Sequence, residues 1–227
     1  MSFKKILCFG SLNPDLIYFV DELPTKGGDI RSLKSSMRPG GTAINCSELI
    51  SLWKKSVQVR GNSIGNDPMG KYLVDYLKEN NINFDGLIIN QSLTPTCSIF
   101  VDSSGERTIV SSGYEGLEWS NFENLNNFDS LIIDRYSIKF IKNKLKDLKK
   151  QNSLFVCQAG YEYEINYKLD FLIVSKDEIN VEQANDLIDS ETVKYILLTS
   201  SSLPARLISS EGNVEIAVSY THLRAHE

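Results

Sequence analysis

The sequence is poor in the residues that build metal sites and disulfide frameworks. Its 227 residues include four cysteines, which lie singly and far apart at Cys8, Cys46, Cys97 and Cys157. No two of them have the spacing of a zinc or redox motif. We therefore expect free thiols in a reducing compartment, three in strands and one in a helix, and a cytoplasmic protein.

Histidine is scarcer still, because the chain has only His222 and His226. Their i, i+4 spacing would place two nitrogen ligands on one face of a helix, but no third ligand is evident. Zinc sites use three or four protein ligands. The sequence therefore gives little support for a metal site of its own at this end.

Long apolar runs and an excess of basic charge are also missing. No stretch approaches the length of a membrane span, and Gly10 interrupts the apolar start too early for a signal peptide. The formal net charge is −5, which argues against nucleic acid and anionic membranes as partners. We expect a globular domain with a sizeable core.

What the sequence does contain is an alternation of short apolar runs with amphipathic helices. Such an alternation predicts an α/β protein with a mainly parallel sheet and helices on both faces. We expect strands at residues 6–9, 57–60, 130–134, 153–157, 171–175 and 195–199, helices at 69–79, 137–150 and 181–188, and a closing hairpin at 207–218.

Two β-rich segments interrupt this alternation, at about residues 16–38 and 95–112. In the first, Ile30 and Leu33 are predicted to point inward. The second has the pattern of a hairpin around a Ser-Ser-Gly turn. Each segment is too short for a domain but long enough for a flap, and the two can pair to make a small sheet.

The most informative stretch is residues 38–45, where Gly40 and Gly41 open an expected helix. Glycine lets the backbone turn sharply and admits a ligand closely, and the first amides of a helix lack partners within it. Asn45, one turn in, can both donate and accept. The buried side is predicted to hold Ala43, Cys46, Ile50 and Trp53. The stretch suits a polyhydroxylated ligand, although a turn that merely caps a helix has the same pattern.

Polar side chains follow three of the predicted strands. They are Asn13 and Asp15 in a polar turn, Asp134 and Arg135, and Lys176, Asp177 and Glu178. Ligands of open α/β sheets bind outside the carboxyl ends of the strands, and carboxylates orient sugar hydroxyls well. Together with the glycine pair, the clusters can converge over one sheet edge. Glu178 suits a hydrated Mg²⁺, but acidic residues are also common at a helix start.

Several motifs together resemble the ribokinase-like carbohydrate kinases, also called the PfkB family, up to about Val218. The motifs are Gly10-Ser11-Leu12-Asn13-Pro14-Asp15, Gly40-Gly41-Thr42-Ala43-Ile44-Asn45, Gly61 to Gly65 with Asp67 and Gly70, and Gly105-Glu106-Arg107-Thr108. Residues 30–45 and 174–177 look closest to the ketohexokinase branch. The resemblance implies a three-layer α/β/α sandwich over residues 1–218, with the two insertions forming a β lid.

The resemblance also implies transfer of the γ-phosphoryl group of ATP to a sugar hydroxyl with Mg²⁺, and a homodimer through the lids. Asp15 would hold sugar hydroxyls and Arg107 would reach the substrate or nucleotide phosphates. Glu178, with Lys176 beside it, would bind Mg²⁺ and phosphate, although the family's Asn-x-x-Glu motif has Ser175 in place of asparagine here. The remaining substrate-binding residues would be Asn13, Gly40, Gly41, Thr42, Asn45 and Asp134 or its neighbour Arg135.

Two features depart from the family pattern. The turn at residues 200–204 lacks the family's glycine, and the signature Asp-Thr-x-Gly-Ala-Gly-Asp, which supplies the catalytic base and anion hole, does not follow Val218. Residues 219–227 look foreign and resemble translated adapter sequence, to be excluded from fold reasoning. We therefore expect a truncated kinase whose full-length parent phosphorylates a small sugar, while this chain does not.

Two other classes of function make different predictions. A sugar-binding remnant or regulatory pseudokinase would bind sugar without turnover. A dinucleotide-binding enzyme would need Gly-x-Gly-x-x-Gly directly after the first strand, and residues 10–13 do not supply it.

Overall fold

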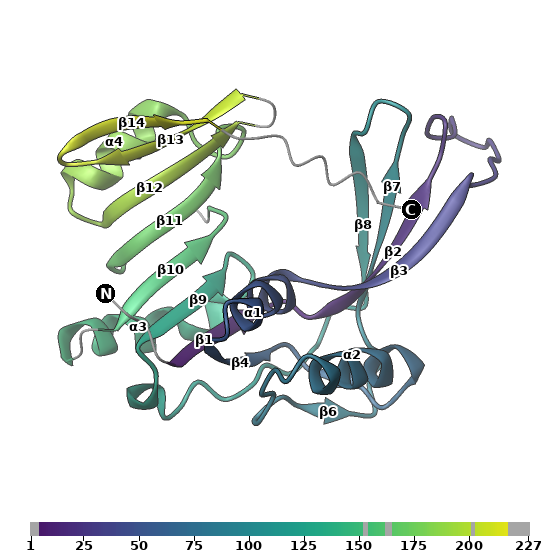
Figure 1. Ribbon diagram of the computed structural model, residues 1–227, viewed down its shortest axis with the longest axis horizontal. Coiled ribbons are helices and arrows are strands. Elements are labelled where there is room, and N and C mark those ends of the chain that lie inside the picture. The colour runs from purple at the N-terminus through teal and green to yellow at the C-terminus, as the bar shows by residue number, and fades with distance from the viewer. Residues whose placement is uncertain (1–4, 152–153, 162–164, 201–202, 218–227) are drawn as a thin grey trace. The chain divides into compact units, whose positions relative to one another are not determined.

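The computed structural model, shown in Figure 1, describes residues 5–151, 154–161, 165–200 and 203–217. The chain divides into two compact units, Met1–Phe128 and Asp129–Glu227. The tail at residues 219–227 lies outside the described residues, as does the centre of the glycine-free turn at Ser201 and Ser202.

The first unit begins with two parallel strands. Strand β1 (Lys5–Gly10) pairs with β4 (Ser56–Gly61), which confirms the strands expected at 6–9 and 57–60. Leu7, Phe9 and Val59 are fully buried, as in parallel strands that are covered on both faces. The short strands β5 (Ile64–Gly65) and β6 (Ile89–Asn90) form a second parallel pair.

Two helices belong to this unit. Helix α1 (Thr42–Leu52) buries Ala43, Ile44, Ser47 and Ile50. Trp53, which was predicted on the buried side, is instead 64% exposed because the helix ends before it. Helix α2 (Pro68–Glu79) starts as its sequence predicts: Asp67 accepts the Gly70 N–H at 2.8 Å, and Pro68 stands at the first helical position.

The two insertions form one four-stranded sheet, here termed the lid sheet (Figure 1). Its strands, in order across the sheet, are β3 (Lys34–Gly40), β2 (Asn13–Phe19), β7 (Thr96–Val101) and β8 (Arg107–Ser112). Strand β2 runs antiparallel to β3 and parallel to β7.

The start of the lid sheet differs from the expectation. Asn13 and Asp15 are not in a turn but open β2, because the ladder to β3 reaches as far as Asn13 opposite Gly40. Ile30 and Leu33, predicted to point inward, precede β3 and are exposed. Their apolar character is therefore not explained by burial within this chain.

The second unit holds four parallel strands followed by an antiparallel hairpin. They are β9 (Ser130–Asp134), β10 (Phe155–Ala159), β11 (Leu169–Ser175), β12 (Val193–Ser200), β13 (Leu203–Ser209) and β14 (Gly212–Ile216). Because β9 to β12 are parallel, their carboxyl ends share one edge, and the loops that leave that edge are neighbours.

The helices of the second unit follow the predicted pattern. Helix α3 (Ile138–Gln151) buries Ile138, Ile141 and Leu145, and α4 (Val181–Asp189) buries Ala184 and Ile188. Of the α3 lysines whose side chains are described, three are exposed and Lys146 is partly exposed. The side chain of Leu148, the last residue of the predicted stripe, lies outside the described set.

The cysteines are all free. Cys8, Cys97 and Cys157 lie in strands and Cys46 in helix α1, as expected, but only Cys8 is fully buried. Within the described residues, no helix is both long and apolar enough to cross a membrane.

Candidate functional site

Gly40 and Gly41 join β3 to α1, and each makes room for a neighbouring group. A Cβ on Gly40 would come within 3.0 Å of the carboxylate atoms of Asp15, and one on Gly41 would collide with the carbonyl of Ser11. Gly41 also has φ +84°, a left-handed conformation that favours glycine. The pair is therefore required by the close approach of Asp15 and Ser11.

The first two amides of α1 are not open to a ligand, contrary to the expectation. The Thr42 N–H donates to Ser11 Oγ at 3.1 Å, and the Ala43 N–H donates to the Ser11 carbonyl at 3.1 Å. Ser11 lies in the link between β1 and β2 and thus caps the helix from there. Among the predicted residues of α1, Asn45 is exposed and Thr42 is partly exposed, so these two offer side chains to a ligand.

Asp15 stands at the end of a chain of hydrogen bonds. Asn13 Nδ2 donates to Asp15 Oδ1 at 2.6 Å, and the hydroxyl of Tyr114 donates to Asn13 Oδ1 at 2.7 Å. Burial raises the pKa of the Asp15 carboxyl, and the hydrogen bond from Asn13 opposes that rise. The result is a half-buried, oriented carboxylate with accepting capacity left for a ligand.

Tyr114 was missed from the sequence. It lies 101 residues from its partner Asn13, in the connection after β8, and no motif or periodicity links the two. Only the pairing of the lid strands brings them together.

Arg107 is not brought to this cluster. It pairs with Val101 at the far end of the hairpin, whereas Asp15 pairs with Cys97. Four residues of strand separate the two positions, roughly 13 Å at the usual rise. Because side chains alternate along a strand, Arg107 and Asp15 still belong to the same face of the lid sheet.

The glycines of the third motif serve packing. A Cβ on Gly61 would collide with the Gly10 carbonyl, one on Gly65 with the Ser92 carbonyl, and one on Gly70 with the Gly65 carbonyl. Each is a close backbone approach with no room for a ligand between the partners. The three glycines of this motif are therefore explained by backbone packing.

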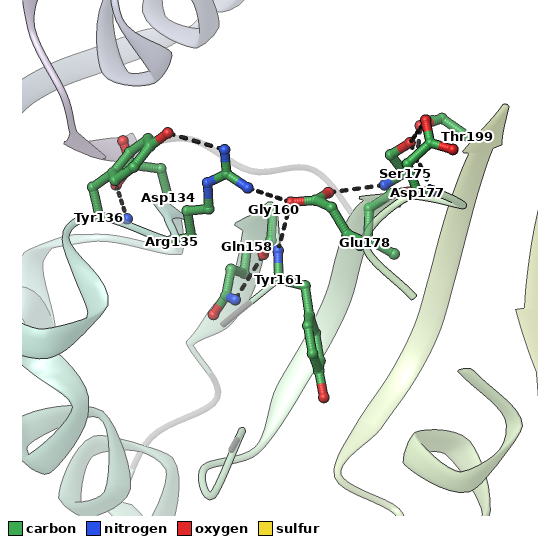
Figure 2. A network of polar contacts seen from close by, with 11 residues as sticks. Asp134, Arg135, Tyr136, Gln158, Gly160, Tyr161, Ser175, Asp177, Glu178 and Thr199 are labelled. Carbon is green, nitrogen blue, oxygen red and sulfur yellow. Dashed lines mark hydrogen bonds and ion pairs between the residues drawn. The ribbon is translucent and has the colours of Figure 1, made fainter. Parts of the chain in front are cut away.

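In the second unit, the loops after β9, β10 and β11 meet around Glu178 (Figure 2). Arg135 Nη1 donates to Glu178 Oε1 at 2.5 Å, and its Nη2 donates to the hydroxyl of Tyr136 at 3.0 Å. The N–H groups of Tyr161 and Ser175 also donate to the Glu178 carboxylate, at 3.4 and 3.0 Å. The second and third polar clusters therefore do converge.

Gly160 provides the space for Arg135. Its φ is +82°, and a Cβ there would lie 3.1 Å from Arg135 Cδ. The loop is held by the buried Gln158, whose Nε2 donates to the Gly160 carbonyl at 2.9 Å and whose Oε1 accepts from Tyr167 at 2.6 Å. The stem of Arg135 thus lies over a rigid glycine turn.

Asp134 and Arg135 have different surroundings. Asp134 is 1% exposed, and its carboxylate accepts the N–H groups of Tyr136 and Ser137 at 3.1 and 2.8 Å. It therefore organises the start of α3. The side chain of Arg135 is 43% exposed, so of the two neighbours it is the one placed to meet a ligand.

The surroundings of Glu178 do not fit a Mg²⁺ ion as they stand. The carboxylate accepts from a guanidinium and two backbone amides, and a cation there would have to displace Arg135. The described residues contain no group of three or more His, Cys, Asp or Glu that could hold a metal ion. Lys176 is exposed and lies in the same loop as Glu178.

The chain is similar to known carbohydrate kinases. Residues 4–214 match the family model "pfkB family carbohydrate kinase". A ribokinase of Dictyostelium discoideum is 25% identical over 175 residues, 77% of this chain and 48% of that protein. The ketohexokinase of Mus musculus is 30% identical over 112 residues, 48% of this chain and 37% of that protein. The chain thus spans less than half the length of these two relatives.

The chain also has the fold of a solved ribokinase structure. The ribokinase of Arabidopsis thaliana, complexed with ribose and ATP, has a TM-score of 0.74 at 16% identity, covering 96% of this chain and 78% of that one. The predicted α/β class, a three-layer sandwich with a mainly parallel sheet and a ribokinase-like fold, is confirmed.

Proposed function

The chain belongs to the pfkB family of carbohydrate kinases, and from this premise we propose that it carries the sugar-binding part of an ATP-dependent sugar kinase. The reaction moves the γ-phosphoryl group of ATP to a sugar hydroxyl. One observation carries the proposal: the Asp15 carboxylate is half-buried, held by Asn13 at 2.6 Å and backed by Gly40 without a side chain between them.

This arrangement suits a sugar because a carboxylate accepts two hydrogen bonds from neighbouring hydroxyls in one plane. Asn45 adds an exposed amide one helical turn beyond Gly41. The substrate contacts that we propose are Asp15, Gly41, Thr42 and Asn45. Asp15 lies on β2, Gly41 follows β3, and Thr42 and Asn45 lie on α1.

The nucleotide side of the proposal rests on the second unit. The Arabidopsis relative is complexed with ATP, and in this chain Arg135 and Lys176 are the cations in the loops after β9 and β11. Both would bind phosphate oxygens. No step of the proposed reaction is assigned to a metal at Glu178, because its carboxylate is committed to Arg135 and two amides.

The second candidate function is sugar binding without phosphoryl transfer. It is favoured by the same engagement of Glu178, whose carboxylate accepts from Arg135 and two backbone amides and is therefore not open to a metal-bound nucleotide. It shares the sugar site of the first candidate and differs only in turnover.

Two further features belong to the proposal. The lid sheet would form a homodimer through β8, which is exposed along its whole length, with Ile109 and Val110 each more than half exposed. Sedimentation velocity of the chain tests this.

The four free thiols support a reducing compartment, so we place the protein in the cytoplasm.

Two assays on the 227-residue chain separate the candidates. Calorimetric titration with D-ribose and D-fructose measures sugar binding, and a coupled ADP-release assay with ATP, Mg²⁺ and the same sugars measures turnover. Binding with turnover supports the kinase, binding alone supports the second candidate, and no binding of any sugar in a wider hexose and pentose panel contradicts both.

A further inference from the structure

Tyr114 lies outside every motif of the sequence, yet it is one step removed from the proposed sugar contact. Its hydroxyl donates to Asn13 Oδ1 at 2.7 Å, and Asn13 Nδ2 donates to Asp15 Oδ1 at 2.6 Å. Asn13 Nδ2 also donates to the Pro14 carbonyl at 3.2 Å. The three side chains form a directed chain of hydrogen bonds from Tyr114 through Asn13 to Asp15.

The direction of this chain follows from the groups themselves. An ionised carboxylate only accepts hydrogen bonds, so the Asn13 amide must turn its NH₂ toward Asp15 and its oxygen toward Tyr114. The reverse orientation would place two acceptors, Asn13 Oδ1 and Asp15 Oδ1, against each other. The Tyr114 hydroxyl is therefore the donor that satisfies the amide oxygen in its working orientation.

Burial makes this donor important. Asn13 is 1% exposed, so water cannot easily replace a missing partner of its amide oxygen. A buried acceptor that loses its donor carries a desolvation penalty, which the side chain can reduce only by rotating away from its present position. Such a rotation lengthens or breaks the bond to Asp15.

We propose that Tyr114 is a positioning residue for sugar binding, acting through Asn13 to hold the carboxylate of Asp15 in the orientation that receives sugar hydroxyls. The proposal rests on the proposed role of Asp15 as the sugar contact. Tyr114 lies two residues after the end of β8. Its hydrogen bond to Asn13 therefore connects the segment that leaves the lid sheet to β2, the strand that carries Asp15.

The charged and titratable neighbours of Asp15 do not obscure the titration of its carboxyl group. Arg38 on β3 and Cys97 on β7 lie opposite it in register, Tyr72 of α2 lies near Arg38, and Tyr114 completes the set. None of these four neighbours is a carboxyl group, so the carboxyl signal followed at this position belongs to Asp15.

The experiment compares Tyr114→Phe with Tyr72→Phe in the full 227-residue chain. Tyr72 is the matched control, because its hydroxyl donates to the Met37 carbonyl at 3.3 Å within the same unit. Carbon-13 NMR of the sugar-free chain follows the Asp15 carboxyl carbon against pH, and calorimetry gives the Kd for D-ribose and D-fructose. Circular dichroism confirms that both variants are folded.

We expect Tyr114→Phe to raise the pKa of Asp15, because the hydrogen bond from Asn13 that lowers this pKa is weakened, and to raise the Kd of the sugar by about three- to tenfold. Tyr72→Phe should change neither. In an Asn13→Ala background, Tyr114→Phe should add almost nothing, since the link to Asp15 is already lost.

Each contrary result has one meaning. An unchanged Asp15 pKa in Tyr114→Phe overturns the relay, whatever the sugar affinity. An undiminished loss of affinity in the Asn13→Ala background overturns it as well, because Tyr114 would then contact the sugar directly. If the pKa rises but the wild-type chain binds no sugar of the wider hexose and pentose panel, the relay is supported and the proposed function fails.

Discussion

Replacing Gly40 with alanine tests the central geometry of the proposed sugar site without removing a polar group. The new Cβ would lie within 3.0 Å of three carboxyl atoms of Asp15, closer than real Cβ contacts allow. Gly40 does not have a positive φ, so alanine meets no backbone strain there. The cost is therefore a steric one, and the carboxylate of Asp15 must move.

The magnitude follows from the clash. Forcing an extra methyl group into a packed site costs about 1–3 kcal/mol, which corresponds to a fall in Tm of roughly 2–4 °C per kcal/mol for a chain of this size. Sugar affinity should fall as well, because the displaced carboxylate loses its alignment with Asn13.

A double-mutant cycle shows whether the clash of the new methyl group with the Asp15 side chain causes the loss of stability. Urea unfolding gives the stability of the wild type, Gly40→Ala, Asp15→Ala and the double variant. Because the nearest atoms to the new methyl group all belong to Asp15, most of the cost of Gly40→Ala should vanish in the Asp15→Ala background. An equal cost in both backgrounds would refute the packing argument.

Three more predictions follow from single contacts. Burial raises the pKa of Asp15 in the folded state above its ordinary value of 3.8. Between these two pKa values the folded chain binds more protons than the unfolded chain. The free energy of unfolding therefore falls as pH rises through this window. Asp15→Asn should therefore unfold at higher urea than the wild type at pH 7, and the difference should shrink in acid. Arg135→Met frees the Glu178 carboxylate, so Mn²⁺-induced water relaxation should detect tighter cation binding in this variant than in the wild type, and not in Arg135→Met combined with Glu178→Gln. Asp67→Ala removes the cap of α2 and should cost about 1–2 kcal/mol in urea unfolding, whereas an effect below a few tenths would contradict the capping bond.

The sequence predicts most of the secondary structure because the signals are local. Apolar runs mark the strands of both units, and Asp67-Pro68 marks the start of α2. The exceptions have physical causes. Asn13 and Asp15 look like a turn but belong to β2, because pairing with β3 overrides their low strand propensity. Trp53 continues the apolar period of α1 but lies beyond the helix end.

The site is less predictable than the fold, because it is built from contacts between distant segments. The glycine pair is recognisable, but Ser11 accepts hydrogen bonds from the first two helix amides, which the sequence pattern leaves open. Arg135 and Glu178 were expected in one region, yet their direct ion pair depends on the parallel order of β9, β10 and β11. Tyr114 had no local signal at all.

The most direct test of the account is the sugar affinity of Asp15→Asn compared with that of Asp75→Asn. Asp75 is a carboxylate of the same unit, on α2, where it pairs with Lys71 on the surface. Calorimetry with D-ribose and D-fructose should show at least about a tenfold weaker Kd for Asp15→Asn, since a hydrogen bond to a charged group contributes about 1.5–3 kcal/mol, and an unchanged Kd for Asp75→Asn. A wild-type affinity in Asp15→Asn would contradict the assignment of this carboxylate as the sugar contact.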